Sequence, residues 1–397
     1  MKKIDTYKYK PLLNAIIILV GVQLGVYVYS ASLPYMQQDL HTTPALINNT
    51  LTVFVFAIGI SQLFIGPMSD RYENKKLILI LVSVLFLSSF CISLETNIYI
   101  ILFLRGIQGF SGGGLSILAK NILKNNYSSE LTKYIAIYSM ASTFIPAFSP
   151  FLGGILQNSF SWRAVFLFIS AYLLTLFIYF LIKLPKTNIG KHASIKTSAP
   201  NLYFFVYFRM AKSFTFMMLS LCNAIIFYIE MMELTFSSFI IQVNYHISPI
   251  SYGAIMAIPA MGFIIGSFLV IRNKGIFSDR QLILIGIYTS ILSCLLLTMN
   301  VLLHFNSVPL YVTAITITNI GLAVSLSPIA AKAFTLFPEH ISGSAIAFTG
   351  FLQMVGASML AYIINKFTNM TQSYFTIILI SLSIILFISI KSIYKKI

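Results

Sequence analysis

Residues 46–67 read LINNTLTVFVFAIGISQLFIGP, residues 68–75 read MSDRYENK, and residues 76–94 read KLILILVSVLFLSSFCISL. The two outer segments are apolar runs of about 20 residues, and the short segment between them holds the charges. An α-helix rises about 1.5 Å per residue, so such a run crosses a hydrocarbon core about 30 Å thick. A helix also satisfies its own backbone hydrogen bonds in lipid. This stretch therefore predicts a helical hairpin that crosses a membrane twice.

The same pattern continues along the whole chain, which contains twelve apolar runs in total. The other ten are approximately residues 11–34, 98–119, 133–157, 163–183, 212–241, 250–271, 281–303, 308–332, 342–365 and 372–390. The composition agrees, because 58% of the residues are hydrophobic and only 9% are charged, whereas a soluble domain has about 25% charged residues. The runs are too long and too uniformly apolar for barrel strands. We predict an all-α membrane protein with twelve transmembrane helices.

The longest polar interruption, from Lys183 to Asn201, divides the twelve runs six and six. It is rich in Lys, Ser, Thr and Pro, as expected of a linker. We predict an amino-terminal six-helix bundle (1–183), a cytoplasmic linker (184–211) and a carboxy-terminal six-helix bundle (212–397). Two six-helix halves around a central site are typical of secondary transporters.

The Lys and Arg residues that give the net charge of +16 lie mostly on one side of the predicted spans. Of the 26 Lys and Arg residues, 23 fall on one side of the predicted spans, two on the other side and one within a span. The positive-inside rule then places both termini in the cytoplasm. Attraction to anionic lipid headgroups explains this charge, so we expect a lipid bilayer and no nucleic acid as partner.

Cofactor and metal chemistry find little support in the sequence. The three cysteines and five histidines stand singly, without metal-ligand spacing, and no Gly-rich phosphate loop occurs. We therefore expect no metal site, no cofactor and no enzymatic activity.

Glu230 and Glu233 lie inside the apolar run 212–241, whereas the other acids lie at span ends or in connections. A charged side chain in the middle of a bilayer costs about 2.5–3.5 kcal/mol, so such a residue normally faces a protein interior or a water-filled path. Three residues apart, the two acids share a helical face. A proton-coupled carrier needs such a titratable group, and paired carboxyls titrate as a unit. The alternative is that both lie in a solvated vestibule nearer the outer end of the span.

The connection between the second and third runs contains Gly66, Asp70 and Arg71, followed by the basic pair Lys75 and Lys76. In this loop of a twelve-span chain, the pattern resembles the signature loop of the major facilitator superfamily. The resemblance implies a gating loop that holds the halves together on the cytoplasmic side when the transporter faces outward. Since glycine lacks a Cβ, we expect Gly66 to allow close helix approach.

Arg105-Gly106-Ile107-Gln108-Gly109 in the fourth run resembles the Arg-x-x-Gln-Gly motif of the superfamily's drug antiporters. The resemblance implies that Arg105 takes part in proton transfer or tunes a neighbouring acid. Gln108 shares its helical face and is a candidate for the cavity wall. The alternative is structural, with Arg105 bonded only to backbone carbonyls.

Residues 146–154, PAFSPFLGG, resemble the antiporter motif Gly-Pro-x-x-Gly-Gly, which is associated with exporters. Proline removes a backbone hydrogen bond and bends a helix, while glycine permits tight packing. The predicted helix-packing residues are Pro146, Pro150, Gly153 and Gly154. Ser149 stands where the family normally has Gly, and this departure leaves proton-coupled uptake open.

The subfamily resemblance is to Bcr/CflA-type drug-resistance transporters and covers essentially the whole chain. It is carried by Leu33-Pro34 and by two segments of the eleventh run, 342–345 and 351–357. Tyr27 stands where those transporters usually have an Asp. The amino-terminal half therefore lacks its usual acid, which leaves Glu230 and Glu233 as the candidates for proton coupling.

A substrate cavity would be lined by polar and aromatic residues on inward faces of the spans. These candidates are Gln23, Tyr27, Ser30, Gln108, Asn223, Phe227, Asn319 and Gln353. We predict a monomeric, proton-coupled antiporter of the inner membrane that exports a lipophilic drug or an endogenous small molecule. The alternatives are export of a siderophore or other metabolite, or proton-coupled uptake. A receptor or scaffold is disfavoured, because it has no need for buried acids and a gating loop.

Overall fold

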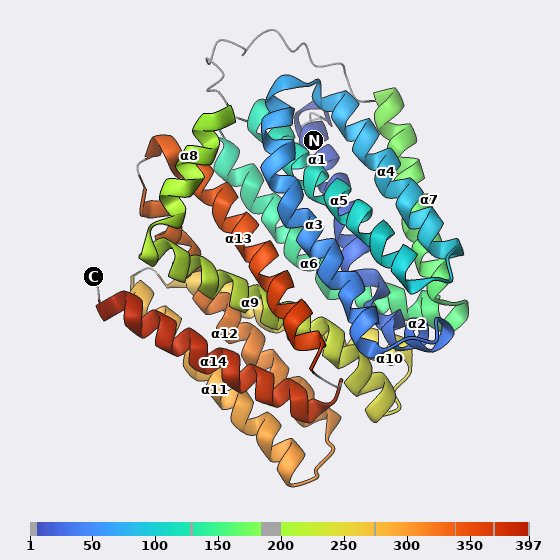
Figure 1. Cartoon of the computed structure of the whole chain (residues 1–397), viewed down its shortest axis with the longest axis vertical. Coiled ribbons are helices and arrows are strands. Elements are labelled where there is room, and N and C mark those ends of the chain that lie inside the picture. Colours follow the sequence, from blue (N-terminus) through green and yellow to red (C-terminus); the bar gives the residue numbers. More distant parts are fainter. Residues whose placement is uncertain are drawn as a thin grey trace, which may run out of the picture.

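The computed structural model describes residues 6–127, 130–183, 200–273, 275–337, 339–367 and 370–395. Within these ranges every regular element is helical (Figure 1). The amino-terminal half consists of α1 (Thr6–Tyr27), the 3-10 helix η1 (Val28–Ser32), α2 (Leu33–Asp39), α3 (Pro44–Arg71), α4 (Asn74–Leu94), α5 (Ile98–Asn126), α6 (Leu131–Ser159) and α7 (Trp162–Lys183). The carboxy-terminal half consists of α9 (Phe214–Phe239), the π-helix η3 (Ile240–Asn244), α10 (Pro249–Arg272), α11 (Asp279–Leu302), α12 (Val308–Thr335), α13 (Glu339–Asn365) and α14 (Gln372–Lys395).

Among the described residues, twelve helical segments are long and apolar enough to cross a membrane, in agreement with the predicted number. The first segment is longer than predicted, because α1, η1 and α2 together form one span from Tyr9 to Asp39. Hydropathy alone did not single out α8 (Pro200–Ala211), a helix inside the predicted linker. Residues 184–199 of that linker lie outside the described residues.

Short polar side chains begin many of the spans. Thr43, Ser248 and Ser307 each precede a proline at the start of a helix and accept a backbone N–H of its first turn. This satisfies one of the donors that a helix leaves free at its start. Ser278 adds a full capping box with Gln281 at the start of α11. Local sequence therefore places the span starts with little help from tertiary contacts.

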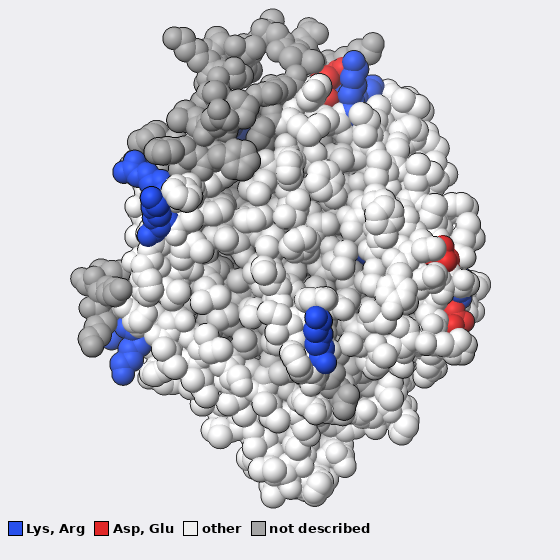
Figure 2. Space-filling view, viewed as in Figure 1, with Lys and Arg blue, Asp and Glu red and all other residues white. Residues whose placement is uncertain are grey.

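The helices lie side by side in two halves, and Figure 1 separates two ends of the molecule. We call the end that holds α8 and the α3–α4 connection the α8 end. The opposite end, which holds η1, α2 and the start of α10, is the α2 end. Figure 2 shows that most of one face carries no charged side chain. Such a face matches the apolar surroundings of a bilayer.

At the α2 end the two halves are in close contact. Gly154 lies so near the backbone of Pro249 that an added Cβ would overlap its carbonyl oxygen, and Gly153 meets Val28 in the same way. The Ser238 hydroxyl donates to the Ser30 carbonyl oxygen at 2.6 Å, across the two halves. These contacts close the α2 end, as small residues do where helices meet in membranes.

Candidate functional site

A cavity of about 410 Å³ lies between the two halves. Its walls come from α1, α3, α5 and α6 on one side and from α9, α10, α12 and α13 on the other. The wall includes Tyr27 and Pro150 near the closed α2 end, and it extends along α5 to Lys120, close to the α8 end. The cavity is therefore closed toward the α2 end and extends toward the α8 end.

Both predicted acids line this cavity, and Glu233 is the more firmly held. The side-chain amide of Asn319, on α12, donates to both carboxylate oxygens of Glu233 at 2.9 and 2.7 Å. Only 6% of Glu233 and 4% of Asn319 are exposed. Hydrogen bonds to a buried charged group are the strong kind, so this amide fixes the orientation of the carboxylate.

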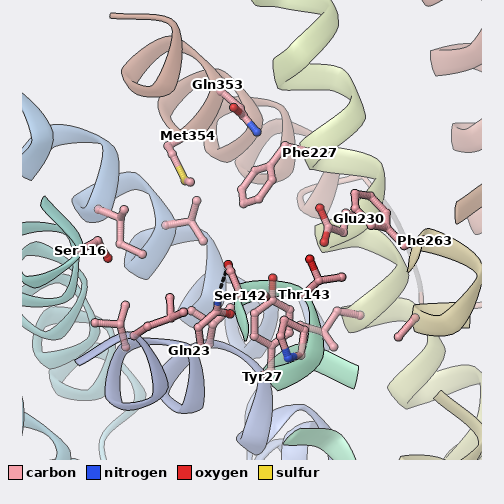
Figure 3. Close-up of a pocket in the computed structure, with 18 of the residues that line it drawn as sticks. Gln23, Tyr27, Ser116, Ser142, Thr143, Phe227, Glu230, Phe263, Gln353 and Met354 are labelled. Atoms are coloured by element: carbon pink, nitrogen blue, oxygen red, sulfur yellow. Dashed lines mark hydrogen bonds between the residues drawn. The ribbon is translucent and has the colours of Figure 1, made fainter. Parts of the chain in front are cut away.

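Glu230, one turn nearer the α8 end on α9, is half-buried and has no hydrogen-bond partner among the described residues. In Figure 3 its carboxyl points into the cavity, with Tyr27 and Thr143 on the opposite wall and Phe263 beside it. Its charge interacts with Tyr27 and with Glu233. One carboxyl of the pair is thus held by the protein, and the other is free to receive a proton or a ligand.

Lys120 of α5 is the cationic residue of the cavity wall. It is exposed and makes no ion pair with the described residues. The acids belong to the carboxy-terminal half and Lys120 to the amino-terminal half, nearer the α8 end. A ligand in the cavity would therefore meet charges of opposite sign at different depths.

The amino-terminal half supplies a polar wall that faces the acids. The Gln23 side-chain amide donates to the Ser142 hydroxyl at 2.9 Å (Figure 3). Thr143 follows in the same turn of α6, whereas Phe227 and Phe263 supply aromatic surface from α9 and α10. Few polar groups on a mostly apolar surface are typical of sites for small amphipathic molecules.

The structure brings together most of the residues predicted for the cavity and for proton coupling. Those that line the cavity are Gln23, Tyr27, Phe227, Glu230, Glu233, Asn319 and Gln353. The prediction missed Gln62, Ser116, Tyr138, Ser142 and Thr143. The Ser142-Thr143 pair, one turn before Pro146, was a polar signal within an apolar run that could have found this wall.

Three predicted cavity residues do not line the cavity. Ser30 belongs to η1 in the closed α2 end, where its hydroxyl donates to the Tyr27 carbonyl oxygen at 2.8 Å. Gln108 is fully buried inside the amino-terminal half. Asn223 shares a helical face with Glu230, but α9 is covered at that level by the helices of its own half and only 1% of Asn223 is exposed.

Arg105 also lies away from the cavity, although it was predicted to couple protons. It is fully buried, and its guanidinium donates to the carbonyl oxygens of Gly25 at 2.8 Å and Thr50 at 3.2 Å. It stacks on Tyr29 and Phe54, with its central carbon 4.4 and 4.2 Å from the ring centroids. The two carbonyl bonds agree with the structural alternative, which did not include the contacts with the rings. Together these contacts join α5 to α1 and α3.

Gln108 completes this buried network. It accepts from Arg105 at 2.6 Å and donates to the Ser89 hydroxyl of α4 at 2.7 Å. The Arg-x-x-Gln-Gly pattern thus joins four helices of the amino-terminal half.

The predicted gating loop lies at the α8 end, between α3 and α4. An added Cβ at Gly66 would meet no atom within 4 Å, so the expected close helix approach there is wrong for this state. The reason is that this stretch of α3 borders the open end of the structure. Lys75 donates to the Leu181 carbonyl oxygen at 3.1 Å, and Lys76 lies 3.9 Å from Glu73. The side chains of two further loop residues, Asp70 and Arg71, lie outside the described residues.

The predicted helix-packing motif divides between two surfaces of α6. Pro146 and Pro150 line the cavity, while Gly153 and Gly154 touch η1 and α10 at the closed end. The helix therefore connects the cavity wall directly to the closure of the α2 end. Among the described residues, no group of three His, Cys, Asp or Glu side chains could hold a metal ion.

Comparison with known proteins identifies the fold family. The family described as Major Facilitator Superfamily matches residues 15–361. The chain belongs to the Major Facilitator Superfamily. It is accordingly a multi-pass membrane transporter of small molecules and not an enzyme, as the sequence predicted.

Relatives within this superfamily include several transporters. The chain is 26% identical to an uncharacterized MFS-type transporter, YdgK, of Bacillus subtilis, and the match covers 86% of this chain and 85% of that protein. It is 29% identical to a bicyclomycin resistance protein homolog of Haemophilus influenzae over 41% of this chain and 42% of the relative. The solved nucleoside transporter NupG, as its D323A mutant, has the same fold, with a TM-score of 0.80 at 15% identity over 96% of this chain and 99% of that one.

Proposed function

We propose that this protein is a proton-coupled exporter of a bacterial inner membrane, which exchanges protons for a lipophilic, amphipathic molecule from the cytoplasm. One observation carries the proposal. Two carboxyl groups on one helix line the cavity between the halves, and Asn319 holds only one of them. Drug-resistance relatives, such as the bicyclomycin resistance protein homolog, are consistent with this substrate class.

The two acids have separate roles in the proposed exchange. Glu230 has no hydrogen-bond partner among the described residues, so it can bind either a proton or the cationic group of a solute. Glu233, held by Asn319, shares the pair's proton with Glu230, because closely spaced carboxyls titrate as a unit. A solute that neutralises Glu230 favours release of that proton, and by linkage a proton favours release of the solute.

The charge distribution assigns direction to the proposed cycle. The positive-inside rule places the α8 end and both termini in the cytoplasm, so the structure corresponds to a state that faces inward. Export then requires the contact of Gly154 with Pro249 and the Ser238–Ser30 hydrogen bond to open while the α8 end closes. We propose that the two halves, 1–183 and 212–397, move as bodies about the cavity, as in other transporters of two repeats. Since one chain forms the whole cavity, we also propose that the monomer transports.

A second candidate substrate is favoured by Lys120. This cation nearer the α8 end makes no ion pair with any residue the structure describes, and it suits a metabolite that carries an anionic group, for example a siderophore. Such a molecule would place its anionic group near Lys120 and its apolar or cationic part toward Phe227 and the acids.

The test uses everted membrane vesicles with an acidified lumen and a fluorescent pH indicator. Ethidium added to wild type is expected to release protons from the lumen. Proton release is expected to be at least tenfold slower in Glu233→Gln and in the Glu230→Gln/Glu233→Gln double variant, because they lack the shared titratable group. Glu95→Gln, which changes an acid in the α4–α5 connection, is the control and should behave as wild type.

Two results would contradict the proposal. If the Glu233→Gln and double variants are expressed equally and retain wild-type proton release, the coupling site is not on α9. If neither ethidium nor a siderophore moves protons in wild type, while a proton gradient drives accumulation of a solute inward, the protein is an uptake symporter.

A further inference from the structure

Between Glu233 and the α2 end, the cavity is closed by hydroxyl groups as well as by apolar side chains. Three tyrosines from three elements lie there: Tyr252 on α10, Tyr311 on α12 and Tyr245 directly after η3. Tyr252 and Tyr311 are fully buried, whereas Tyr245 is half-buried. They therefore span the distance from the protein interior to the surface.

Tyr252 and Tyr311 are close enough to Glu233 to interact with its charge. The Tyr311 hydroxyl lies 2.9 Å from the Ser237 hydroxyl. Ser237 follows Glu233 by four residues on α9 and so lies on the same helical face, one turn closer to the α2 end. Tyr311 also interacts electrostatically with Tyr252 and Tyr245, which makes it the central member of the group.

The third tyrosine connects this group to the surface of the α2 end. The Tyr245 hydroxyl donates to the Gln372 side-chain oxygen at 2.8 Å and accepts from the Asn300 amide at 3.2 Å. Burial raises the pKa of Tyr245, so its hydroxyl stays protonated at neutral pH and keeps a proton to donate. Tyr245 also directly follows a π-helical turn, a distortion frequent at functional sites.

The polar groups around Tyr252 join the two halves of the transporter. The Tyr252 hydroxyl donates to the Leu234 carbonyl oxygen at 3.3 Å, with the hydroxyls of Ser30 and Ser238 close by. Ser238 in turn donates to the Ser30 carbonyl oxygen. Ser30 belongs to the amino-terminal half, and Tyr252, Leu234 and Ser238 belong to the carboxy-terminal half. Any opening of the α2 end must therefore rearrange the hydroxyls around Tyr252.

We propose that Tyr311 and Tyr245 form a proton path between Glu233 and the solvent at the α2 end, which conducts before this end opens wide enough for substrate. This inference rests on the proposed function, since it assumes that Glu233 carries the coupled proton. When the path conducts toward the carboxyl, Tyr245 takes a proton from water and passes its own proton to Tyr311. Tyr311 in turn passes its own proton to the carboxylate of Glu233. Each hydroxyl carries one proton before and after, and Glu233 gains the single proton that the solvent loses.

The geometry also explains why this path does not discharge the proton gradient in the present state. Among the described residues, Tyr311 is hydrogen bonded to Ser237 but not to Glu233 or Tyr245. The path is thus interrupted on both sides of Tyr311 while the cavity extends toward the α8 end. Bridging water or a rearrangement of the α2 end has to complete it before protons can pass.

The test compares two transport modes in proteoliposomes with ethidium as the probe. Proton-driven transport needs Glu233 to be reloaded from the α2 end, whereas ethidium exchange at equal pH needs no net proton movement. Tyr311→Phe is expected to slow proton-driven transport at least tenfold and to leave exchange within about twofold of wild type. Acidifying the α2 side by one pH unit should restore most of the lost rate, which loss of packing alone would not produce.

The matched control is Tyr228→Phe, since Tyr228 is another buried tyrosine whose hydroxyl has no hydrogen-bond partner among the described residues. It should leave both modes unchanged. Tyr245→Phe provides a second variant if Tyr311→Phe fails to fold, and it should slow the proton-driven mode in the same selective way, because Tyr245 is the other member that passes the proton. Proton-driven rates for Tyr311→Phe or Tyr245→Phe equal to those of Tyr228→Phe would overturn the path. Full coupling in Glu233→Gln would instead overturn the proposed function itself.

Discussion

Asn319 is the side chain that distinguishes the two acids of the cavity, because it donates to both oxygens of Glu233. Its removal leaves a buried carboxyl without a donor. A hydrogen bond to a charged group contributes about 1.5–3 kcal/mol, so we expect Asn319→Ala to reduce ethidium-driven proton release at least tenfold. The measurement is the everted-vesicle assay, with ethidium binding followed in parallel.

Asn223→Ala is the matched control for this prediction. Asn223 is an equally buried amide, and neither its nitrogen nor its oxygen has a hydrogen-bond partner among the described residues. Its loss removes no hydrogen bond, so proton release should stay at the wild-type level. Equal effects of the two substitutions would show that Asn319 does not act through Glu233.

At the scale of elements, α6 connects the cavity wall to the closure of the α2 end. A methyl group at Gly154 would overlap the Pro249 backbone of α10. Overpacking of this kind costs about 1–3 kcal/mol, which corresponds to about a 5- to 150-fold shift in population. We therefore expect Gly154→Ala to disfavour the state closed at the α2 end and to increase maleimide labelling of a cysteine placed at Ser238.

Gly106→Ala provides the control, because its added methyl would meet Val53 at an ordinary contact distance of 3.4 Å. It should leave the labelling of the same cysteine unchanged. If Gly154→Ala also leaves it unchanged, the contact between α6 and α10 does not limit opening of the α2 end.

At the scale of the whole molecule, the structure and the charge distribution together predict which side reaches the cavity. In a chain whose three native cysteines are replaced, Ser142→Cys should react with an impermeant maleimide in everted vesicles and at least tenfold less in right-side-out vesicles. Ile276 and Asn306 are exposed in connections at opposite ends, and cysteines there report the two sides independently. Faster reaction of Ser142→Cys from the right-side-out face would show that the closed end faces the cytoplasm.

The membrane class and the twelve spans follow from the sequence, because each depends on local hydropathy and charge. Glu230 and Glu233 could be found in the same way, since an acid inside an apolar run is anomalous without any structure. Tertiary packing decided which polar residues meet. Arg105 and Ser30 read as site residues in sequence, but contacts between distant helices place both of them outside the cavity. Helical periodicity gives the face on which a residue lies, but not the neighbour that covers that face. The hydrogen bonds from Asn319 to Glu233, and the tyrosines between Glu233 and the α2 end, were therefore decided only by the tertiary structure.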